Sequence, residues 1–376
     1  MKIGIDITML VYTGSGVANY TFNLVKNLLK IDKENEYRLF YSSFRRPKNF
    51  YYLNELKRLG GKIYEYRFPP TLLQLWWSKL NIIPVEWFIG KVDAYFSSDF
   101  LRPPLLKGTK GITTVHDLTW KIYPQYHEQR IIEAHAIKLK KTIKYNDTVI
   151  TDSLSTKKDL SKYFQEINTK KVQVVYPGIG EQFKLKARDQ ELKMILEKYF
   201  IDLEDKFLLY VGAIEPRKNL VLAINIFNEL VKDSRFSDFK FVITGRAGWK
   251  NENVFQSIKQ LGLEKKVKFT GFVVDEDLPY LYNAADLTVY LSAYEGFGLP
   301  PLESLACGTK VIVGDNSSLR ETVNKEFLVD LSDKNKVLEK MKYLLTNKIK
   351  INSEEIQEKF NWKESAKKFL KIISTL

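Results

Sequence analysis

The sequence has little of the chemistry that stabilises secreted proteins or binds metal ions. Its 376 residues include one cysteine, Cys307, and three histidines. A single cysteine excludes an internal disulfide, and with no recognisable secretory signal it favours a reducing cytosol. The segment from residue 1 to residue 11 is apolar, but Asp6 interrupts it. We therefore expect a buried first strand there and not a signal peptide.

Long apolar runs, short repeats and low-complexity segments are also missing. No run reaches the roughly 18 uncharged apolar residues of a membrane-spanning helix. His127 and His135 fall in an expected helix without the spacing of metal ligands. A hydrophobic content of 44% and a charged content of 28% are typical of a folded soluble protein. A chain of this length is expected to form two domains of about 150–200 residues.

Positive charge is concentrated in the first half. Residues 1–180 have 28 Lys and Arg against 16 Asp and Glu, whereas residues 181–376 have 31 against 29. The first half should therefore meet an acidic partner, and since no nucleic-acid motif is present, an anionic membrane surface is one candidate. Tryptophans in Leu72–Gly90 suit such an interface. A buried helix pair in the core is the alternative for this segment, which contains Trp76, Trp77 and Trp87.

Short apolar runs alternate with helical patterns along the whole chain. This alternation predicts α/β domains with parallel sheets and helices on both faces. The Pro-Gly step in residues 176–186 marks a seam, so we expect two Rossmann-like doubly wound domains, residues 1–178 and 179–359, facing a central cleft. The amphipathic residues 360–376 are expected to form a helix that crosses back to the first domain. Strands are expected at 3–7, 37–41, 62–66, 94–96, 111–115, 148–151, 172–176, 207–211, 240–244, 267–270, 287–291 and 310–313.

Two glutamates, Glu295 and Glu303, stand in the Gly-rich stretch of residues 292–308 with seven residues between them. The first follows an apolar run, and the second lies in the helix that Pro300 and Pro301 are expected to open. Open α/β sheets bind ligands where a strand leads through a loop to a helix N-terminus, and that helix end favours an anion. The stretch therefore predicts a nucleotide-sugar site, with carboxylates that accept hydrogen bonds from sugar hydroxyls.

Two adjacent cations, Arg217 and Lys218, stand where another expected strand leads into a helix. Cations near a helix N-terminus oppose its dipole, so their placement indicates a bound anion. Together they can neutralise a diphosphate and assist the departure of a nucleoside diphosphate. Solvated charges at the start of a helix are the alternative.

Two further turns sit at expected strand ends. Gly14 and Gly16 follow the first strand, where glycine lets the backbone approach a ligand, although a tight turn explains them equally well. His116 and Asp117 end another apolar strand, where a histidine suits chemistry near neutral pH. By contrast, Asp275-Glu-Asp277 resembles the metal-binding Asp-x-Asp of some sugar transferases, but here it is expected to cap a helix.

In this order the motifs resemble the retaining glycosyltransferases of family 4, which have the architecture called GT-B. The resemblance covers nearly the whole chain. Its strongest marks are the Glu295–Glu303 motif, Arg217-Lys218-Asn219 and Gly271-Phe272. The Val-His-Asp-Leu form around His116 looks most like bacterial mannosyltransferases of O-antigen and capsule assembly.

The resemblance implies a role for each site residue. Arg217 and Lys218 would hold the donor diphosphate, Glu303 the ribose and Glu295 the donor sugar. His116 would contact the sugar near the reacting carbon. It also implies that no metal or other cofactor is needed. The remaining contacts would come from the amides of Gly296, Phe297, Gly298 and Leu299, from Gly16 in the opposite domain and, for the acceptor, from Asp117.

The predicted function is thus retaining transfer of a hexose, with mannose favoured, to a lipid-linked or oligosaccharide acceptor. The first domain would hold the acceptor and the second the nucleotide-sugar donor. We expect a cytoplasmic protein, peripheral on the inner face of the membrane, in cell-surface polysaccharide assembly. A nucleotide-sugar epimerase of the same fold and an inactive nucleotide-sugar binding protein are the alternatives. Base contacts are expected around residues 245–249 and do not distinguish uracil from guanine.

Overall fold

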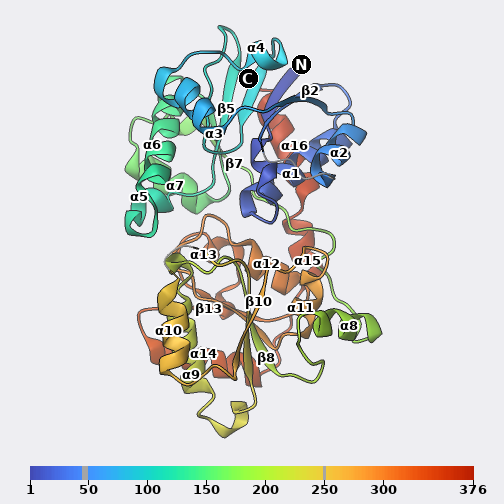
Figure 1. Cartoon of the computed structure of the whole chain (residues 1–376), viewed down its shortest axis with the longest axis vertical. Helices are drawn as coiled ribbons and strands as arrows, with labels where there is room; N and C mark the ends of the chain where they lie inside the picture. Colours follow the sequence, from blue (N-terminus) through green and yellow to red (C-terminus); the bar gives the residue numbers. More distant parts are fainter. Residues whose placement is uncertain (45–49, 249–250) are drawn as a thin grey trace. The chain divides into compact units, whose positions relative to one another are not determined.

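A computed structural model describes residues 1–44, 50–248 and 251–376. These residues form two compact units, one made of Met1–Gly178 with Phe360–Leu376 and the other of Ile179–Lys359. Each unit has a parallel sheet with helices packed around it (Figure 1). The prediction of two doubly wound α/β domains is confirmed. Within the described ranges, no helix is both long and apolar enough to span a membrane.

The sheet of the first unit has seven parallel strands among the described residues, in the order β3-β2-β1-β4-β5-β6-β7. The strand order reverses beside β1, as in other doubly wound folds. Strands β4 and β6 are buried along their whole length, as expected for a parallel sheet that is covered on both faces. The strands are β1 Lys2–Asp6, β2 Glu36–Ser42, β3 Lys62–Tyr66, β4 Ala94–Ser97, β5 Lys110–Val115, β6 Thr148–Thr151 and β7 Val172–Val174.

Helices of the first unit include one from the far end of the chain. The terminal helix α16 buries one face against α1 and the sheet, where Phe369 meets Phe96 edge to face at 4.8 Å. Ser365 Oγ also donates to the Tyr176 carbonyl at 2.6 Å. The helices are α1 Gly16–Ile31, α2 Tyr51–Arg58, α3 Pro70–Leu73, α4 Glu86–Ile89, α5 Thr119–Ile122, α6 Gln129–Lys144, α7 Leu154–Tyr163 and α16 Trp362–Ile373.

The tryptophan-rich segment is divided between core and surface. Trp77 lies in a π-helical turn, Gln74–Leu80, and is fully buried, with its Nε1 donating to the Ile83 carbonyl at 3.0 Å. Trp87, in α4, is 71% exposed. Of the two alternatives for this segment, burial in the core therefore holds for Trp77, which packs beside Phe40, while Trp87 lies on the surface.

The second unit repeats the same strand order. Its described residues form six parallel strands in the order β10-β9-β8-β11-β12-β13. Because β8 and β11 are neighbours, the loops that leave their carboxyl ends lie side by side, and both predicted motifs are on these loops. The strands are β8 Phe207–Val211, β9 Lys240–Thr244, β10 Val267–Gly271, β11 Leu287–Tyr290, β12 Val311–Gly314 and β13 Leu328–Val329.

Helices surround this second sheet (Figure 1). One of them, α9, buries its apolar face through Leu220, Ile224 and Phe227 in the larger hydrophobic core. The helices are α8 Gln190–Lys198, α9 Leu220–Leu230, α10 Glu252–Gln260, α11 Leu278–Ala284, α12 Leu299–Ala306, α13 Leu319–Thr322, α14 Lys334–Thr346 and α15 Ser353–Lys359.

Candidate nucleotide-sugar site

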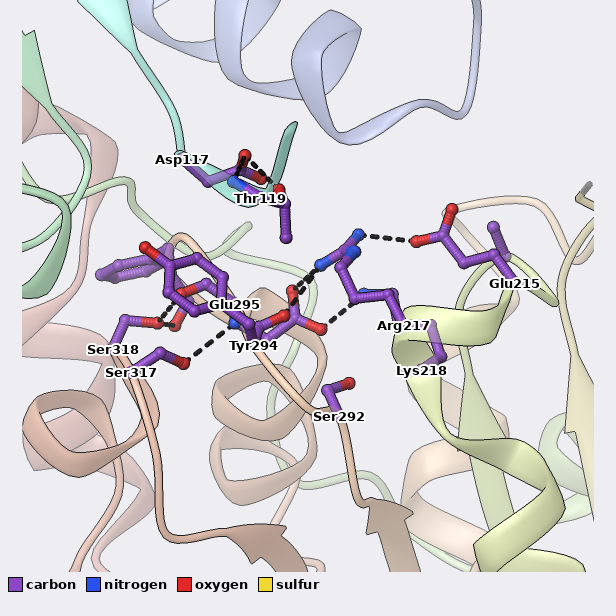
Figure 2. Close-up of polar contacts among 12 residues, drawn as sticks. Asp117, Thr119, Glu215, Arg217, Lys218, Ser292, Tyr294, Glu295, Ser317 and Ser318 are labelled. Carbon is purple, nitrogen blue, oxygen red and sulfur yellow. Dashed lines mark hydrogen bonds and ion pairs between the residues drawn. The ribbon is translucent and has the colours of Figure 1, made fainter. Parts of the chain in front are cut away.

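Glu295 of the second unit lies between two cations. Its Oε1 accepts from Lys218 Nζ at 2.7 Å, and its Oε2 accepts from Arg217 Nη1 at 2.8 Å. Arg217 also donates to Glu215 Oε1 at 2.6 Å, and Lys218 donates to Tyr290 OH at 2.7 Å. Figure 2 shows the guanidinium of Arg217 directed toward both carboxylates. The structure thus brings the two sequence motifs into direct contact.

Burial and charge act in opposite directions on this cluster. Burial alone would raise the pKa of Glu295, but Arg217 and Lys218 outweigh it and lower that pKa to about 2. Burial and the neighbouring Arg217 lower the pKa of Lys218, while Glu295 partly restores it. Glu295 is therefore a carboxylate at neutral pH. A group that stays ionised and doubly hydrogen-bonded is a poor general acid or base.

Serines from the following segment hold the Gly-rich loop in place. Ser318 Oγ donates to the carbonyls of Glu295 and Phe297, both at 3.0 Å, and Ser317 Oγ accepts from the Glu295 amide at 2.9 Å. Gly298 has a φ of +90°, and a methyl group there would lie 2.7 Å from Leu319 Cδ2. The turn before α12 therefore requires glycine at this position.

The N-terminus of α12 offers fewer amides than its sequence position indicates. The helix begins at Leu299, one residue before the prolines that were expected to open it. Pro300 and Pro301 have no N–H, so in the first turn only Leu299 and Leu302 have amide donors. Donors to an anion must therefore come mainly from residues 296–299 of the loop.

Glu303 occupies a different environment from Glu295. It lies in α12, is buried, and accepts a hydrogen bond from Tyr282 OH at 3.0 Å. Burial, assisted by the negative charge of Asp275, raises the pKa of Glu303 to about 8. The two glutamates of one motif therefore have opposite protonation states at neutral pH.

In the first unit, His116 lies beyond the carboxyl end of β5 between two acceptors. Its Nδ1 is 2.7 Å from Asp152 Oδ2, and its Nε2 is 3.1 Å from the Ser98 carbonyl. Burial opposes a charge on the ring, but Asp152 outweighs it and raises the pKa of His116. Only the imidazolium can donate to both acceptors at once. Tyr20 from α1 packs edge to face on the ring at 4.8 Å.

Asp117 and Gly16 also lie at this carboxyl edge. Asp117 Oδ1 accepts from the Thr119 amide at 2.9 Å and from the Thr119 hydroxyl, which orders the start of α5 (Figure 2). Gly16 is the first residue of α1. The preceding residue, Ser15, caps this helix, since its Oγ accepts a hydrogen bond from the Ala18 amide at 3.2 Å. A methyl group at Gly16 would meet no atom within 4 Å, so this backbone has open space beside it.

The sequence reasoning missed the residues that support His116. Asp152 stands at the end of β6, and its place after an apolar strand was a usable signal. Lys138 gave none, because it falls in the middle of α6, yet it is buried and donates to the Thr114 carbonyl at 2.6 Å. Asp99 lies nearby, where burial raises its pKa to about 6 despite Lys138 and His116.

Asp277 does not cap α11 with its side chain as expected. It stands at the N-cap position without a capping hydrogen bond, and its carboxylate instead accepts from Lys198 and from Tyr199 OH. The backbone of Asp277 has helical φ and ψ angles and not the extended conformation typical of a capping residue, and its carboxylate contacts residues at the end of α8.

Of the residues expected to contact the base, Trp249 lies outside the described residues. Across residues 1–44, 50–248 and 251–376, no group of three or more acidic, histidine or cysteine side chains is placed to hold a metal ion.

Comparisons with known proteins show what the chain is similar to. Residues 193–369 match the family described as glycosyl transferases group 1. O-antigen chain mannosyltransferase B of Escherichia coli is 28% identical over 336 residues, which are 88% of this chain and 86% of that protein.

Solved structures share the whole fold. Sucrose-phosphate synthase of Thermosynechococcus elongatus has a TM-score of 0.78 at 18% identity, covering 100% of this chain and 98% of that one. Anabaena HepE, solved in complex with UDP and glucose, has a TM-score of 0.74 at 15% identity over 100% of both chains. The chain therefore carries a glycosyltransferase group 1 domain at residues 193–369 and has the GT-B fold.

Proposed function

We propose that the protein is a retaining glycosyltransferase that moves a hexose, with mannose favoured, from a nucleoside-diphosphate sugar to a lipid-linked or oligosaccharide acceptor. It would act in the assembly of a cell-surface polysaccharide. The observation that supports this best is the buried contact of Arg217 and Lys218 with Glu295 beside the Gly-rich loop. Two cations and a carboxylate at one strand edge suit a diphosphate joined to a sugar.

In this proposal the second unit binds the donor. Arg217 and Lys218 receive the diphosphate and stabilise the charge that develops on it as the sugar departs. Glu295 accepts hydrogen bonds from sugar hydroxyls, and Glu303 accepts them from the ribose. The loop amides of residues 296–299 face the sugar or the phosphate. Mannose is favoured because O-antigen chain mannosyltransferase B of Escherichia coli matches this chain over 336 residues.

Retention is proposed to come from attack on the same face of the sugar. The bond from the anomeric carbon to the phosphate oxygen breaks, the acceptor oxygen bonds to that carbon, and its proton passes to the leaving phosphate. A double displacement needs a free carboxylate on the opposite face. Glu295 is held by two cations and Glu303 is protonated when no ligand is bound, so neither is a poised nucleophile.

The first unit is proposed to bind the acceptor. His116, as an imidazolium, is proposed to exchange its contact with the Ser98 carbonyl for one with the sugar or the phosphate near the reacting carbon. Asp117 contacts the acceptor, and Gly16 lies against the diphosphate. No metal or other cofactor is proposed, because Arg217 and Lys218 supply the positive charge that a divalent ion otherwise provides.

We also propose that the protein works in the cytoplasm, peripherally on the inner face of the membrane. Exposed apolar side chains in the same segment as Lys79 support this, whereas Trp77 is buried and does not contribute to such a surface. They are Leu80, Ile82 and Trp87, exposed by 54%, 45% and 71%.

The test is turnover of a panel of GDP- and UDP-sugars with purified protein, a lipid-linked acceptor and EDTA. We expect a glycosylated product whose anomeric configuration, read by NMR, matches that of the donor. An inverted product contradicts retention, and loss of turnover with EDTA contradicts metal independence. A new epimer formed from donor alone identifies an epimerase. Donor binding without any product identifies a binding protein.

A further inference from the structure

The first unit has a hollow where its strands begin, at the edge of the sheet opposite to the one that carries His116. It lies beside Lys110, the first residue of β5, and Thr148, the first residue of β6, and its volume is about 900 Å³. We call it the amino-edge pocket. Since β5 runs from Lys110 to Val115, about 17 Å of strand separates this pocket from the turn that carries His116. Ligand pockets commonly have volumes of about 300–1,000 Å³.

The amino-edge pocket is strongly basic. Among the described residues that line it, Asp147 is the one acidic side chain, and Arg102 already neutralises it through two hydrogen bonds, at 2.9 and 2.7 Å. Both partners are buried, so this pair belongs to the wall and does not cancel the surrounding charge. Six lysines line the same hollow: Lys107, Lys110, Lys170, Lys171, Lys368 and Lys371.

Most of these ammonium groups have no protein partner. Lys171 donates to the Asn146 carbonyl at 2.7 Å, and Lys368 lies 5.9 Å from the Tyr176 ring. Within the described part of the chain, the other four lysines of the pocket make no ion pair or side-chain hydrogen bond. Elsewhere on the first unit, exposed lysines do find carboxylates, as Lys57 does with Glu65 at 2.6 Å. Converging like charges without counterions favour a bound anion.

An adjoining hollow on the same edge provides a contrast. It shares Lys107 and Thr109 with the amino-edge pocket, but Glu34, Glu36 and Asp93 also line it. Its cations, which include Lys2 and Lys91, are therefore balanced. The excess of positive charge is specific to the amino-edge pocket and does not extend over the whole edge of the sheet.

The pocket wall is held by side-chain contacts before any ligand arrives. The Arg102 guanidinium stacks over the Tyr145 ring at 4.3 Å, and Asn81 Nδ2 donates to Tyr145 OH at 3.0 Å. Thr109 Oγ1 donates to the Val92 carbonyl at 3.1 Å. A preformed wall lowers the entropic cost of binding, so the ligand has to order mainly the lysine side chains.

We propose that the amino-edge pocket binds a phosphate-bearing ligand, through these lysines, at a site separate from the donor site. Lysine is a common point-charge partner of phosphate, and several lysines match a ligand with more than one negative charge. A phospholipid headgroup and a soluble diphosphate present the same chemistry here. The inference rests on contacts within the first unit alone and does not depend on the proposed function.

Two probes distinguish the sources of the phosphate. Inorganic pyrophosphate, titrated by calorimetry, tests a soluble ligand, and flotation with vesicles of phosphatidylcholine with or without phosphatidylglycerol tests a headgroup. We expect saturable, salt-sensitive binding of at least one probe by the full chain. Titration of Lys218→Ala isolates the amino-edge pocket from the donor site, because that variant should still bind pyrophosphate if the pocket does.

A pair of matched variants locates the binding. Lys170→Gln/Lys371→Gln removes two charges from the pocket, and Lys2→Gln/Lys91→Gln removes two from the adjoining hollow. Since each lysine near an anionic surface contributes about fivefold, the first variant should bind about 25-fold more weakly. The second should change by less than about twofold. An equal loss in both variants, or binding of neither probe by the unmodified chain, overturns the proposal. Unchanged thermal unfolding shows that each variant is folded.

Discussion

The Glu295 carboxylate accepts a hydrogen bond from the Lys218 ammonium, with Oε1 and Nζ 2.7 Å apart. Both side chains are buried, so water screens the pair only weakly. Arg217 donates to the second carboxylate oxygen at 2.8 Å. The two cations proposed to receive the diphosphate are thus already paired with carboxylates, both with Glu295 of the other motif and Arg217 also with Glu215. A diphosphate must therefore share these cations with Glu295 or displace it.

Replacing Lys218 with alanine should abolish most turnover. Removing one charge donor from a transition state typically lowers kcat by about 10²–10³-fold. Stability should fall by no more than about 3 kcal/mol, because Arg217 still compensates Glu295. Both are measured on one preparation, by kcat at saturating donor and by urea unfolding. Lys198→Ala, which removes a cation from the Asp277 pair, is the control and should keep its activity. Near-normal kcat in Lys218→Ala would exclude the diphosphate role.

Glu295→Gln should separate nucleotide binding from turnover. Without the carboxylate, Lys218 loses its counterion and Arg217 keeps only Glu215, so a free nucleoside diphosphate should bind at least as tightly as to the unmodified protein. Turnover should nevertheless fall, because the contact with the sugar hydroxyls is lost. Calorimetry with the nucleotide and kinetics with the sugar donor measure the two effects. Weaker nucleotide binding in Glu295→Gln would show that the carboxylate does not compete with the diphosphate.

The same variant has a predicted dependence on pH. The pKa of Glu295 is lowered to about 2 in the folded protein, from about 4.5 in the unfolded chain. Its ionisation therefore contributes stability that is present above pH 4.5 and is lost as the pH falls toward 2. The difference in unfolding free energy between the unmodified protein and Glu295→Gln should narrow over this range. A constant difference would argue against the ion cluster.

Much of the fold and the membership of this cluster could be predicted from the sequence. Most strands of both sheets are buried on two faces, so they appear as apolar runs, whereas the edge strands β3 and β10 are partly exposed. The contact between Lys218 and Glu295 follows from the pairing of β8 with β11, which places the ends of two distant strands side by side. Strand order is not encoded in any local pattern. The sequence therefore predicted that both residues belong to the site, but it could not predict that they contact each other.

Other features depend on long-range packing and could not be predicted. Trp77 and Trp87 lie in the same apolar segment, but Trp77 is buried because it packs in the aromatic core around Phe40, whereas Trp87 is exposed. The raised pKa of Glu303 likewise follows from burial and from the negative charge of Asp275. Sequence spacing carries no information on such surroundings, because the neighbours come from other elements.

Glu303 should destabilise the protein as the pH rises. Its pKa is raised to about 8 from about 4.5 in the unfolded chain, so between these values the folded protein binds a proton that the unfolded chain does not. Stability from this group is therefore full below pH 4.5 and falls until about pH 8. Glu303→Gln should remove this slope, which thermal unfolding from pH 5 to pH 9 measures. Parallel curves for the two proteins would contradict the assignment.

Nucleotide binding should be coupled to the loss of the proton from the Glu303 carboxyl. If the ionised Glu303 accepts hydrogen bonds from the ribose, binding releases a proton below pH 8, and affinity rises with pH up to about that value. Calorimetry in buffers of different ionisation enthalpy counts the protons released. A 2′,3′-dideoxynucleotide is the control and should bind with less proton release. Equal release for both nucleotides would exclude the ribose contact.

Asp152 should set the charge of His116. Asp152→Asn keeps an acceptor for Nδ1 but removes the negative charge that raises the pKa of His116. The imidazole should then titrate at lower pH, which NMR of the ring nitrogens measures directly. In the unmodified protein, stability from the charged ring is full below about pH 6.5 and is lost as the pH rises through the raised pKa. Asp152→Asn should lose that dependence, whereas an unchanged titration would show that Asp152 does not control the ring.

Alanine substitutions at Gly298 and Gly16 should have different effects, because the first strains the backbone and the second blocks the approach of a ligand. Gly298→Ala forces a side chain into a left-handed conformation and against Leu319, so it should destabilise the second unit by about 1–3 kcal/mol. Urea unfolding should detect this loss. Turnover should fall with it, since Ser318 holds the same loop in place through the carbonyls of Glu295 and Phe297.

Gly16→Ala should behave in the opposite way. The new methyl group meets no protein atom within 4 Å, and alanine is a better helix former than glycine, so stability should stay within about 0.5 kcal/mol. If the donor diphosphate lies against this backbone, the methyl group blocks it, and the KM for donor should rise at unchanged stability. Normal donor kinetics in Gly16→Ala would leave this glycine as a simple turn residue and remove it from the donor site.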